Sequence, residues 1–453
     1  MKPNLRRKLL GFVLAFLLCF IGTADPVQSF ASLPNELRLI SGQQSRLDVA
    51  MPVQAVASVD RPDVLQLNGS RESKLQVSLK HPLQLNPQQS GNAEVTLKLF
   101  GKIPLKTVHV KVIPELKVIP GGQTIGVKVK SSGILVVGHH LVRVQNGAKV
   151  SPGEAAGLKV GDLLTTMDGK PLNDVTKVAD IVEKAGKANK PLDISFKRGG
   201  KEMTTKLSPA YDQEDQSWRL GLYIRDSAAG VGTLTFYAPH QKVYGALGHV
   251  ITDMNTQTPI DVGSGQIVQS NVTSISRSEE GEPGEKRATF TKDGKILGNV
   301  ERNTHFGIFG KMNNLPEHGL YQEPIPIALS HEVKEGPAEI LTVVEGQEVE
   351  RFTVDIVHVS KQDAPATKGL VLRITDPRLL KKTGGIVQGM SGSPIVQDGK
   401  LIGAVTHVFV NDPKSGYGCF IEWMLQDSGI LQSTESTPQN LKAVNALRFF
   451  VVK

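Results

Sequence analysis

The stretch Gly389-Met390-Ser391-Gly392-Ser393-Pro394 lies between two short apolar runs, residues 385–387 and 395–396. Flanking glycines allow a tight, exposed turn that projects a serine hydroxyl into a cleft, with backbone N–H groups directed at a developing oxyanion. A hydroxyl at its ordinary pKa is a poor nucleophile, so this interpretation requires a histidine base and a carboxylate that orients it. Without both partners, the motif is only a glycine-rich hairpin.

Length and composition limit the class of protein. A chain of 453 residues is too long for one compact core, so two or three domains are expected. A hydrophobic fraction of 39%, with 45 glycines and 26 prolines, fits a globular protein of strands and turns. The net charge of +8 is spread along the chain without a basic helix or a pattern of aromatic and basic strand residues, which argues against nucleic-acid binding. Two cysteines exclude a disulfide framework and a cysteine-based metal site.

The first 31 residues have the pattern of a targeting segment. Four basic residues precede an uncharged apolar run at 9–24, and small residues near Ala31 would suit a cleavage site. Positive charge before the run favours a cytoplasmic N-terminus and transfer of the remainder across the membrane. The sequence thus predicts an exported protein, with cleavage or retention of residues 1–31 as an anchor left open.

Residues 32–117 show short alternating runs separated by polar turns, which predicts a small β-rich domain without visible chemistry. The next segment, 118–210, contains SPGEAAGLKVGDLL at 151–164 and then an amphipathic helix pattern. It resembles a PDZ domain, in which a peptide adds as an extra strand and its terminal carboxylate is held by backbone N–H groups. The candidate binding edge comprises Gly133, Ile134, Leu135 and Val136. A PDZ fold used only as a rigid spacer is the alternative.

Residues 211–428 are rich in strand patterns and glycine-containing turns, which indicates a β-barrel region; residues 429–453 form a C-terminal tail. The fold class predicted overall is mainly β with short helices. His249 stands out among the 11 histidines because a turn of small residues delivers it at the start of an apolar strand. This is comparable with the histidine turn of chymotrypsin-like enzymes, and its position before Ser391 fits their chain order.

Other candidate residues are harder to separate. The adjacent pair His139 and His140 would point to opposite faces of a strand, so no metal site is proposed there. His407 is expected to pack on a strand beside the site. Several aspartates lie between His249 and Ser391. Spacing does not choose among four of them, although the usual chain order points away from the last: Asp261, Asp355, Asp363 and Asp376.

Three stretches together resemble one family: YGALGHVITD at 244–253, GGIVQGMSGSPI at 384–395 and GAVTHVFVND at 403–412. They are similar to the stage IV sporulation protein B (SpoIVB) peptidases, PDZ-containing serine peptidases of endospore-forming bacteria. The resemblance spans the export segment, the PDZ region and the peptidase region. It implies a chymotrypsin-like β-barrel peptidase preceded by a PDZ domain, and it implies no cofactor.

The resemblance also implies residue roles. His249 would be the base, Ser391 the nucleophile and Asp376 the orienting acid. Ser393 competes as nucleophile, but Ser391 occupies the position at which the N–H groups of Gly389 and Ser391 can form an oxyanion hole. Asp376 rests on the resemblance alone.

Such peptidases are implied to be exported across the forespore membrane into the intermembrane space. There they would cleave themselves and then a membrane-bound partner, the inhibitory subunit of an intramembrane protease complex, so that a pro-sigma factor is processed during sporulation. The PDZ domain would bind a peptide ligand and regulate self-cleavage. Two alternatives remain at this point: a secreted PDZ adaptor with an inactive barrel, and an HtrA-like quality-control protease.

Overall fold

The structure is a computed structural model that describes residues 33–49, 51–145, 147–290, 294–362 and 364–431. It is mainly β, as predicted from the alternating apolar runs. The predicted targeting segment, Asp363 and most of the C-terminal tail lie outside the described residues. Within the described residues no helix has the length and apolar character needed to cross a membrane.

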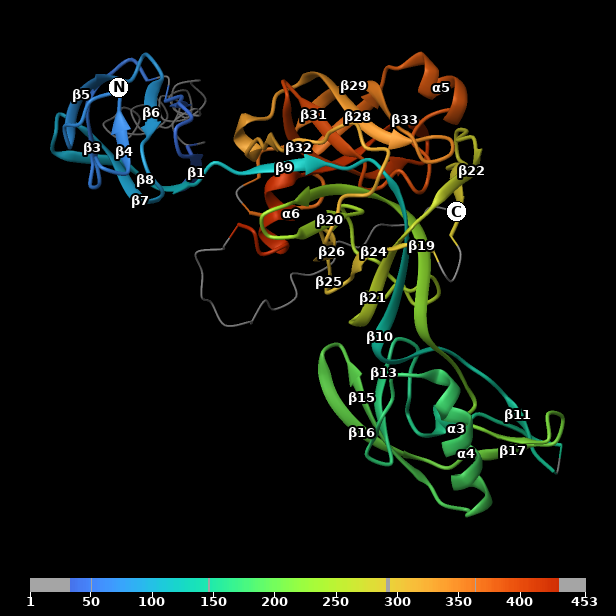
Figure 1. Cartoon of the computed structure of the whole chain (residues 1–453). Helices are drawn as coiled ribbons and strands as arrows, with labels where there is room; N and C mark the ends of the chain where they lie inside the picture. The colour runs from blue at the N-terminus through green and yellow to red at the C-terminus, as the bar shows by residue number, and fades with distance from the viewer. Residues whose placement is uncertain (1–32, 50, 146, 291–293, 363, 432–453) are drawn as a thin grey trace, which may run out of the picture.

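The N-terminal β-domain has its own hydrophobic core and is drawn in blue in Figure 1. Alternating burial along its strands, as in Gln54–Val59, places one face of each sheet inside. Its five-stranded sheet, in spatial order, contains β1 (Glu36–Ile40), β8 (Ile103–Ile113), β7 (Gly91–Leu99), β3 (Gln54–Val59) and β5 (Lys74–Ser78). Its three-stranded sheet contains β2 (Ser45–Leu47), β6 (Leu83–Pro87) and β4 (Leu65–Leu67).

Two barrels follow the N-terminal β-domain. The one nearer the C-terminus, called here the second barrel, is closed. Continuous apolar strands such as Leu401–Val405 are buried on both faces, one face against the barrel interior and the other against neighbouring elements. The barrel order is β28 (Gly336–Val343), β29 (Val349–Val359), β30 (Leu370–Ile374), β33 (Asp412–Phe420), β32 (Lys400–Phe409) and β31 (Pro394–Gln397). The associated short helices are η2 (Ser330–Glu332), α5 (Pro377–Thr383) and α6 (Ile421–Asp427).

The first barrel is an incompletely closed sheet built mostly from residues 117–131 and 226–326. Its core contains Ile125, Val127 and Leu234. Its strands are β9 (Lys117–Pro120), the first half of β10 (Thr124–His139), the second half of β19 (Leu222–Ala238), β20 (Val243–Ala246), β21 (Val262–Gln269), β24 (Ile296–Asn299), β25 (Arg302–Thr304), β26 (Gly307–Lys311) and β27 (Ile325–Pro326). A separate hairpin, β22 (Asn271–Ser276) and β23 (Glu285–Thr289), joins the two barrels.

Residues 132–225 form a compact unit, called here the PDZ unit, at the far end of β10 and β19 (Figure 1). Ile134 and Val136 of β10 lie in its core, and Trp218, Leu222 and Ile224 pack against that core. Its other elements are β11 (Val142–Arg143), β12 (Lys149–Val150), α3 (Pro152–Ala155), β13 (Leu163–Met167), β14 (Lys170–Pro171), η1 (Val175–Lys177), α4 (Val178–Lys187), β15 (Leu192–Arg198), β16 (Lys201–Leu207), β17 (Ala210–Asp212) and β18 (Ser217–Arg219).

The PDZ unit is therefore inserted into the first barrel and does not precede it. The predicted division into 118–210 and 211–428 differs from the packing at both boundaries, because residues 118–131 pair within the barrel and residues 217–225 complete the PDZ unit. β10 and β19 are continuous across both bodies, with irregular register between Lys130 and Leu135. A boundary within a continuous strand leaves no composition signal.

One buried lysine lies where the barrels meet. The Lys286 side chain on β23 is 2% exposed, and its Nζ donates to the hydroxyls of Thr124 on β10 (3.3 Å) and Thr342 on β28 (3.0 Å). Burial lowers the pKa of this amine to about 7. Its charged neighbours on β23, Glu285 and Arg287, are exposed and pair with each other at 3.7 Å.

We expect Lys286→Met to change how stability depends on pH. Between about pH 7 and 10 the unfolded chain keeps the lysine proton and the folded chain does not, so the free energy of unfolding of the wild type rises with pH. Relative to Lys286→Met, the wild type should gain about 1 kcal/mol per pH unit in this window. Denaturant unfolding of both proteins at pH 7.5 and 9.5 measures this gain, and a difference that is independent of pH would contradict it.

Candidate active site

A cleft of about 1050 Å³ lies between the two barrels, and both His249 and Ser391 line it. His249 comes from the turn after β20 of the first barrel, and Ser391 from the turn before β31 of the second. The predicted nucleophile and the predicted base, 142 positions apart in sequence (391 − 249), thus reach one cavity. In the described part of the chain, the Ser391 hydroxyl forms no hydrogen bond to another residue, and it faces the cleft without a competing partner.

The serine turn has the backbone geometry that its glycines predict. Gly389 and Gly392 both have φ of +92°, a region that residues with a side chain rarely adopt. A Cβ on Gly392 would approach the carbonyl oxygen of Thr233 to 2.2 Å, so no side chain fits there. The turn is consequently fixed by backbone contact with β19 of the other barrel.

Thr233 of β19 forms hydrogen bonds to both the serine turn and the histidine turn. Its N–H donates to the carbonyl of Ser391 (3.1 Å), and its hydroxyl donates to the carbonyl of Gly389 (2.8 Å). Its own carbonyl accepts the N–H of Leu247, in the turn that carries His249 (3.2 Å). Thr235, two residues further along the same face, donates to the carbonyl of Gly392 (2.8 Å). Sequence patterns place the two threonines on one strand face but give no sign of what they contact.

The N–H groups of Gly389 and Ser391 are free to bind an oxyanion. Neither donates to an acceptor among the described residues, whereas the carbonyls of both are held by Thr233. The oxyanion-hole role of these two N–H groups stays a prediction. Ser393 differs, since it is fully buried and its hydroxyl has no hydrogen-bond partner within the described chain. Burial makes Ser393 inaccessible to a substrate.

His249 is oriented by the backbone of its own turn. Its Nδ1 lies 2.9 Å from the carbonyl oxygen of Val250, so this nitrogen carries the proton and donates. The other ring nitrogen, Nε2, then has the lone pair that a general base needs. Burial lowers the pKa of His249 below its usual value, and the imidazole is therefore neutral at pH 7.

The structure does not bring Asp376 to this pair, so its predicted role requires correction. Asp376 caps the N-terminus of α5, where its carboxylate accepts from the N–H and guanidinium of Arg378 at 2.9 to 3.2 Å and, more weakly, from the N–H of Thr353 (3.4 Å). The start of β30 lies near the cleft, because Lys368, just before this strand, lines it. Asp376 follows the other end of the same strand. The Arg378 hydrogen bond is the main cause that lowers the pKa of Asp376.

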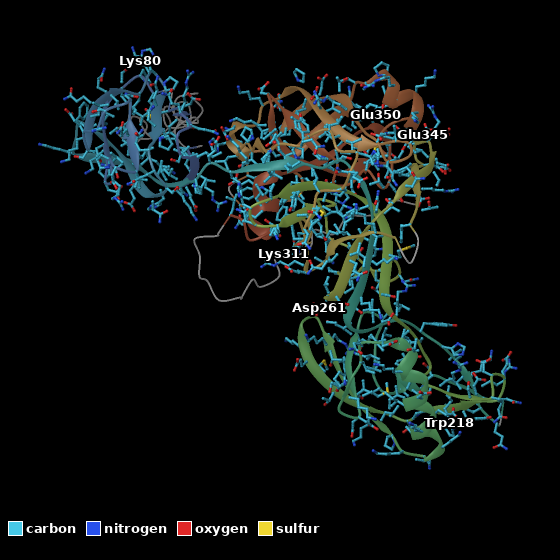
Figure 2. All side chains as sticks on the ribbon, in the orientation of Figure 1. Lys80, Trp218, Asp261, Lys311, Glu345 and Glu350 are labelled. Atoms are coloured by element: carbon cyan, nitrogen blue, oxygen red, sulfur yellow. The ribbon has the colours of Figure 1, made fainter. Side chains whose placement is uncertain are left out.

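Asp261 and Asp355 also lie outside the cleft, whereas Asp363 is not among the described residues. Asp261 accepts from the Ser132 hydroxyl (2.8 Å) at the junction with the PDZ unit, where Figure 2 labels it, and Asp355 lies within β29. Among the described residues that line the cleft, Asp253 is the one with a carboxylate. Its side chain is 2% exposed and forms an ion pair with Arg225 at 2.6 Å. The signal in the sequence that could have predicted this carboxylate is the four-residue spacing of Asp253 from His249.

His407 lies beside His249, as expected, with ring centroids 5.4 Å apart. Desolvation, followed by the charges of His249 and Lys368, lowers the pKa of His407 to about 4, so it is neutral at pH 7. His139 and His140 contact separate groups in the PDZ unit, the carbonyl of Leu158 and the hydroxyl of Tyr223. Over the described ranges, no cluster of ligands suitable for a metal ion occurs.

The predicted peptide-binding edge is an interior strand. Ile134 and Leu135 pair with β13 on one side, and Leu135 and Val136 pair with β19 on the other. A Cβ on Gly133 would approach the carbonyl oxygen of Leu164 to 2.4 Å, which confirms the close packing of that strand. Because both edges are occupied, Gly133, Ile134, Leu135 and Val136 cannot receive an added strand.

Comparisons with known proteins agree with the architecture. The SpoIVB peptidase S55 family model matches residues 216–425, and the PDZ domain model matches residues 124–208. No curated protein matches the chain.

Two solved structures give weak overall similarity. The PDZ domain of an SdrC-like protein from Listeria monocytogenes is 18% identical, with 20% of this chain and 87% of that chain covered and a TM-score of 0.17. The active form of the Rv3671c protease from M. tuberculosis is 14% identical, with 46% and 78% covered and a TM-score of 0.25.

The two family matches together cover the peptidase barrels and the PDZ unit, and they agree with the glycine-framed serine, the histidine turn and the inserted unit described above. The chain therefore carries a SpoIVB peptidase S55 domain, of a serine peptidase family, together with a PDZ domain.

Proposed function

We propose that this protein is a serine endopeptidase in which Ser391 is the nucleophile and His249 the general base. The observation that carries the proposal is the shared cleft, into which the two barrels each contribute one of these residues. The free N–H groups of Gly389 and Ser391 and the neutral state of His249 support the same chemistry. No cofactor is needed for this reaction.

The reaction begins when His249 Nε2 takes the proton of the Ser391 hydroxyl as Oγ attacks the substrate carbonyl carbon. The carbonyl oxygen becomes an oxyanion that the N–H groups of Gly389 and Ser391 bind. The imidazolium then gives its proton to the leaving amine, the peptide bond breaks, and an acyl-enzyme remains. A water molecule, deprotonated by His249, then attacks the acyl carbon. The bond from that carbon to Ser391 Oγ breaks, and the imidazolium returns the proton to Oγ. The carbonyl of Val250 keeps the imidazole in the required tautomer throughout.

The family supports a further proposal about the substrate. In this proposal the protein is exported across the forespore membrane, cleaves itself, and then cleaves the extracytoplasmic part of a membrane-bound inhibitory subunit. The released intramembrane protease would process a pro-sigma factor, and the PDZ unit would bind a peptide ligand. The basic and apolar pattern of residues 1–31 supports export.

We expect Ser391→Ala and His249→Ala each to reduce labelling by a fluorophosphonate probe by at least about 1000-fold, because each removes a partner of the acylation step. Ser393→Ala is the matched control two residues away, and it should be labelled like the wild type because Ser393 is buried outside the cleft. The measurement is the rate of covalent labelling of the purified protein. A wild-type protein that does not react at any serine would favour the inactive adaptor over the enzyme.

Asp376→Asn should leave the labelling rate within about threefold of the wild type, since Asp376 contacts Arg378 and not His249. The amide can still cap α5 but loses the charged hydrogen bonds, which costs about 1–2 kcal/mol of stability. Labelling kinetics and thermal unfolding are measured on the same samples. A fall in labelling of 100-fold with an intact fold would return Asp376 to the catalytic group.

Self-cleavage separates a signalling peptidase from a quality-control protease. The purified wild-type chain should shorten to defined fragments, whereas Ser391→Ala should remain full length because it has no nucleophile. N-terminal sequencing of the fragments identifies the cleaved bonds. Extensive digestion of a denatured generic protein at a comparable rate would instead support the HtrA-like alternative.

A further inference from the structure

Lys286 lies directly behind the serine turn and is not used by the mechanism above. It is absent from the described residues that line the cleft, so it cannot act on a substrate there. Its side chain is nevertheless fully enclosed, and the stem lies against Gly389, where an added Cβ would approach the Lys286 Cβ to 3.0 Å. The lysine and the turn are therefore in direct van der Waals contact.

The backbone of the Lys286 strand holds the residue that precedes Gly389. The N–H of Lys286 donates to the carbonyl of Gln388 (2.8 Å), and the N–H of Gln388 donates to the carbonyl of Gly284 (2.8 Å). Gln388 thus continues the sheet beside Glu285 as a parallel bridge. This pairing fixes the plane of the peptide bond between Gln388 and Gly389.

The orientation of that peptide decides the direction of the Gly389 N–H. In a trans peptide the C=O and the N–H point in opposite directions. Because the Gln388 carbonyl points to β23, the N–H of Gly389 points away from β23, and no described residue accepts it. If this peptide turned over, the carbonyl of Gln388 would replace the N–H donor, and the oxyanion hole would be lost.

The amine of Lys286 fixes β23 to both barrels. Nζ donates to Thr124 at the start of β10 in the first barrel and to Thr342 of β28 in the second. Both threonines are buried. In the described part of the chain no carboxylate pairs with this amine, so the site is held by two neutral hydroxyls.

A buried amine without a carboxylate is costly for folding. An apolar side chain of similar length would fill the same space without that cost. Such a departure from the rules of core packing is expected where a residue serves the active site and not stability.

We propose that Lys286 is a positioning residue for the oxyanion hole: it anchors β23 to the two barrels and so holds the Gln388–Gly389 peptide with the N–H of Gly389 available to the substrate. The role rests on the proposed function, in which that N–H stabilises the tetrahedral intermediate. Lys286 acts through Gly389 and does not itself touch the substrate.

The test is Lys286→Met in the full chain, which keeps the stem beside Gly389 and removes the hydrogen bonds of Nζ. Saturation kinetics with a fluorophosphonate probe give the maximal labelling rate and the half-saturating probe concentration separately. We expect the maximal rate to fall about 10- to 100-fold, because an oxyanion donor is misplaced. We expect the half-saturating concentration to stay within about threefold, since the cleft wall is unchanged.

Thermal unfolding distinguishes positioning from a purely structural role. Removal of the buried amine should leave the midpoint of unfolding at pH 7.5 equal to or above that of the wild type, while labelling slows. Lys286→Arg, which restores donors to both threonines if the pocket accommodates it, should recover part of the rate. Lys295→Met is the matched control, because Lys295 is exposed and its amine forms an ion pair with Glu317 (3.2 Å) away from the cleft.

Several results would overturn the inference. Wild-type labelling kinetics in a folded Lys286→Met protein would do so, as would a loss of rate that only accompanies a fall in the unfolding midpoint. Failure of the proposed function looks different, because the wild type itself would then not be labelled, or Ser391→Ala would still be labelled. The two failures are thus separated by the same set of proteins.

Discussion

The active site depends on a backbone crossing at Gly392, where three segments from two barrels meet without any side chain between them. A Cβ there would lie 2.2 Å from the Thr233 carbonyl oxygen and 2.5 Å from the N–H nitrogen of Leu247. At this crossing Thr233 connects the serine turn to the histidine turn through its N–H and its carbonyl. The proposed nucleophile and the proposed base are consequently positioned by main-chain hydrogen bonds, which are harder to alter by substitution than side-chain contacts.

The inserted PDZ unit shares two strands with this site. Residues 228–231 of β19 line the cleft, and the same strand continues into the PDZ unit at Leu222 and Ile224. Arg225, between these two parts, pairs with buried Asp253 in the loop that follows His249. A continuous strand and the Arg225–Asp253 ion pair therefore connect the PDZ unit to the histidine turn, so a displacement of the PDZ unit would also shift that turn. Figure 1 shows β10 and β19 as the physical connection.

Local patterns predicted the parts of the structure that local chemistry determines. Glycines at 389 and 392 indicated the serine turn because few other residues adopt its backbone angles, and alternating apolar residues indicated strands. The insertion of the PDZ unit could not be predicted, because a strand that crosses two domains has one uninterrupted pattern. The position of Lys286 depends on long-range contacts with Thr124 and Thr342, and a single sequence gives no record of those contacts.

The Val250 carbonyl and a carboxylate are not equivalent partners for His249. Either can accept the Nδ1 proton and select the tautomer, but only a charged carboxylate stabilises the imidazolium that forms during acylation. Burial acts in the opposite direction, because it lowers the pKa of His249 and so disfavours that same charged form. Under the proposed mechanism, transition-state stabilisation would therefore come mainly from the oxyanion hole. The precision with which β23 holds the Gly389 N–H then matters more than it would in a site with a charged third partner.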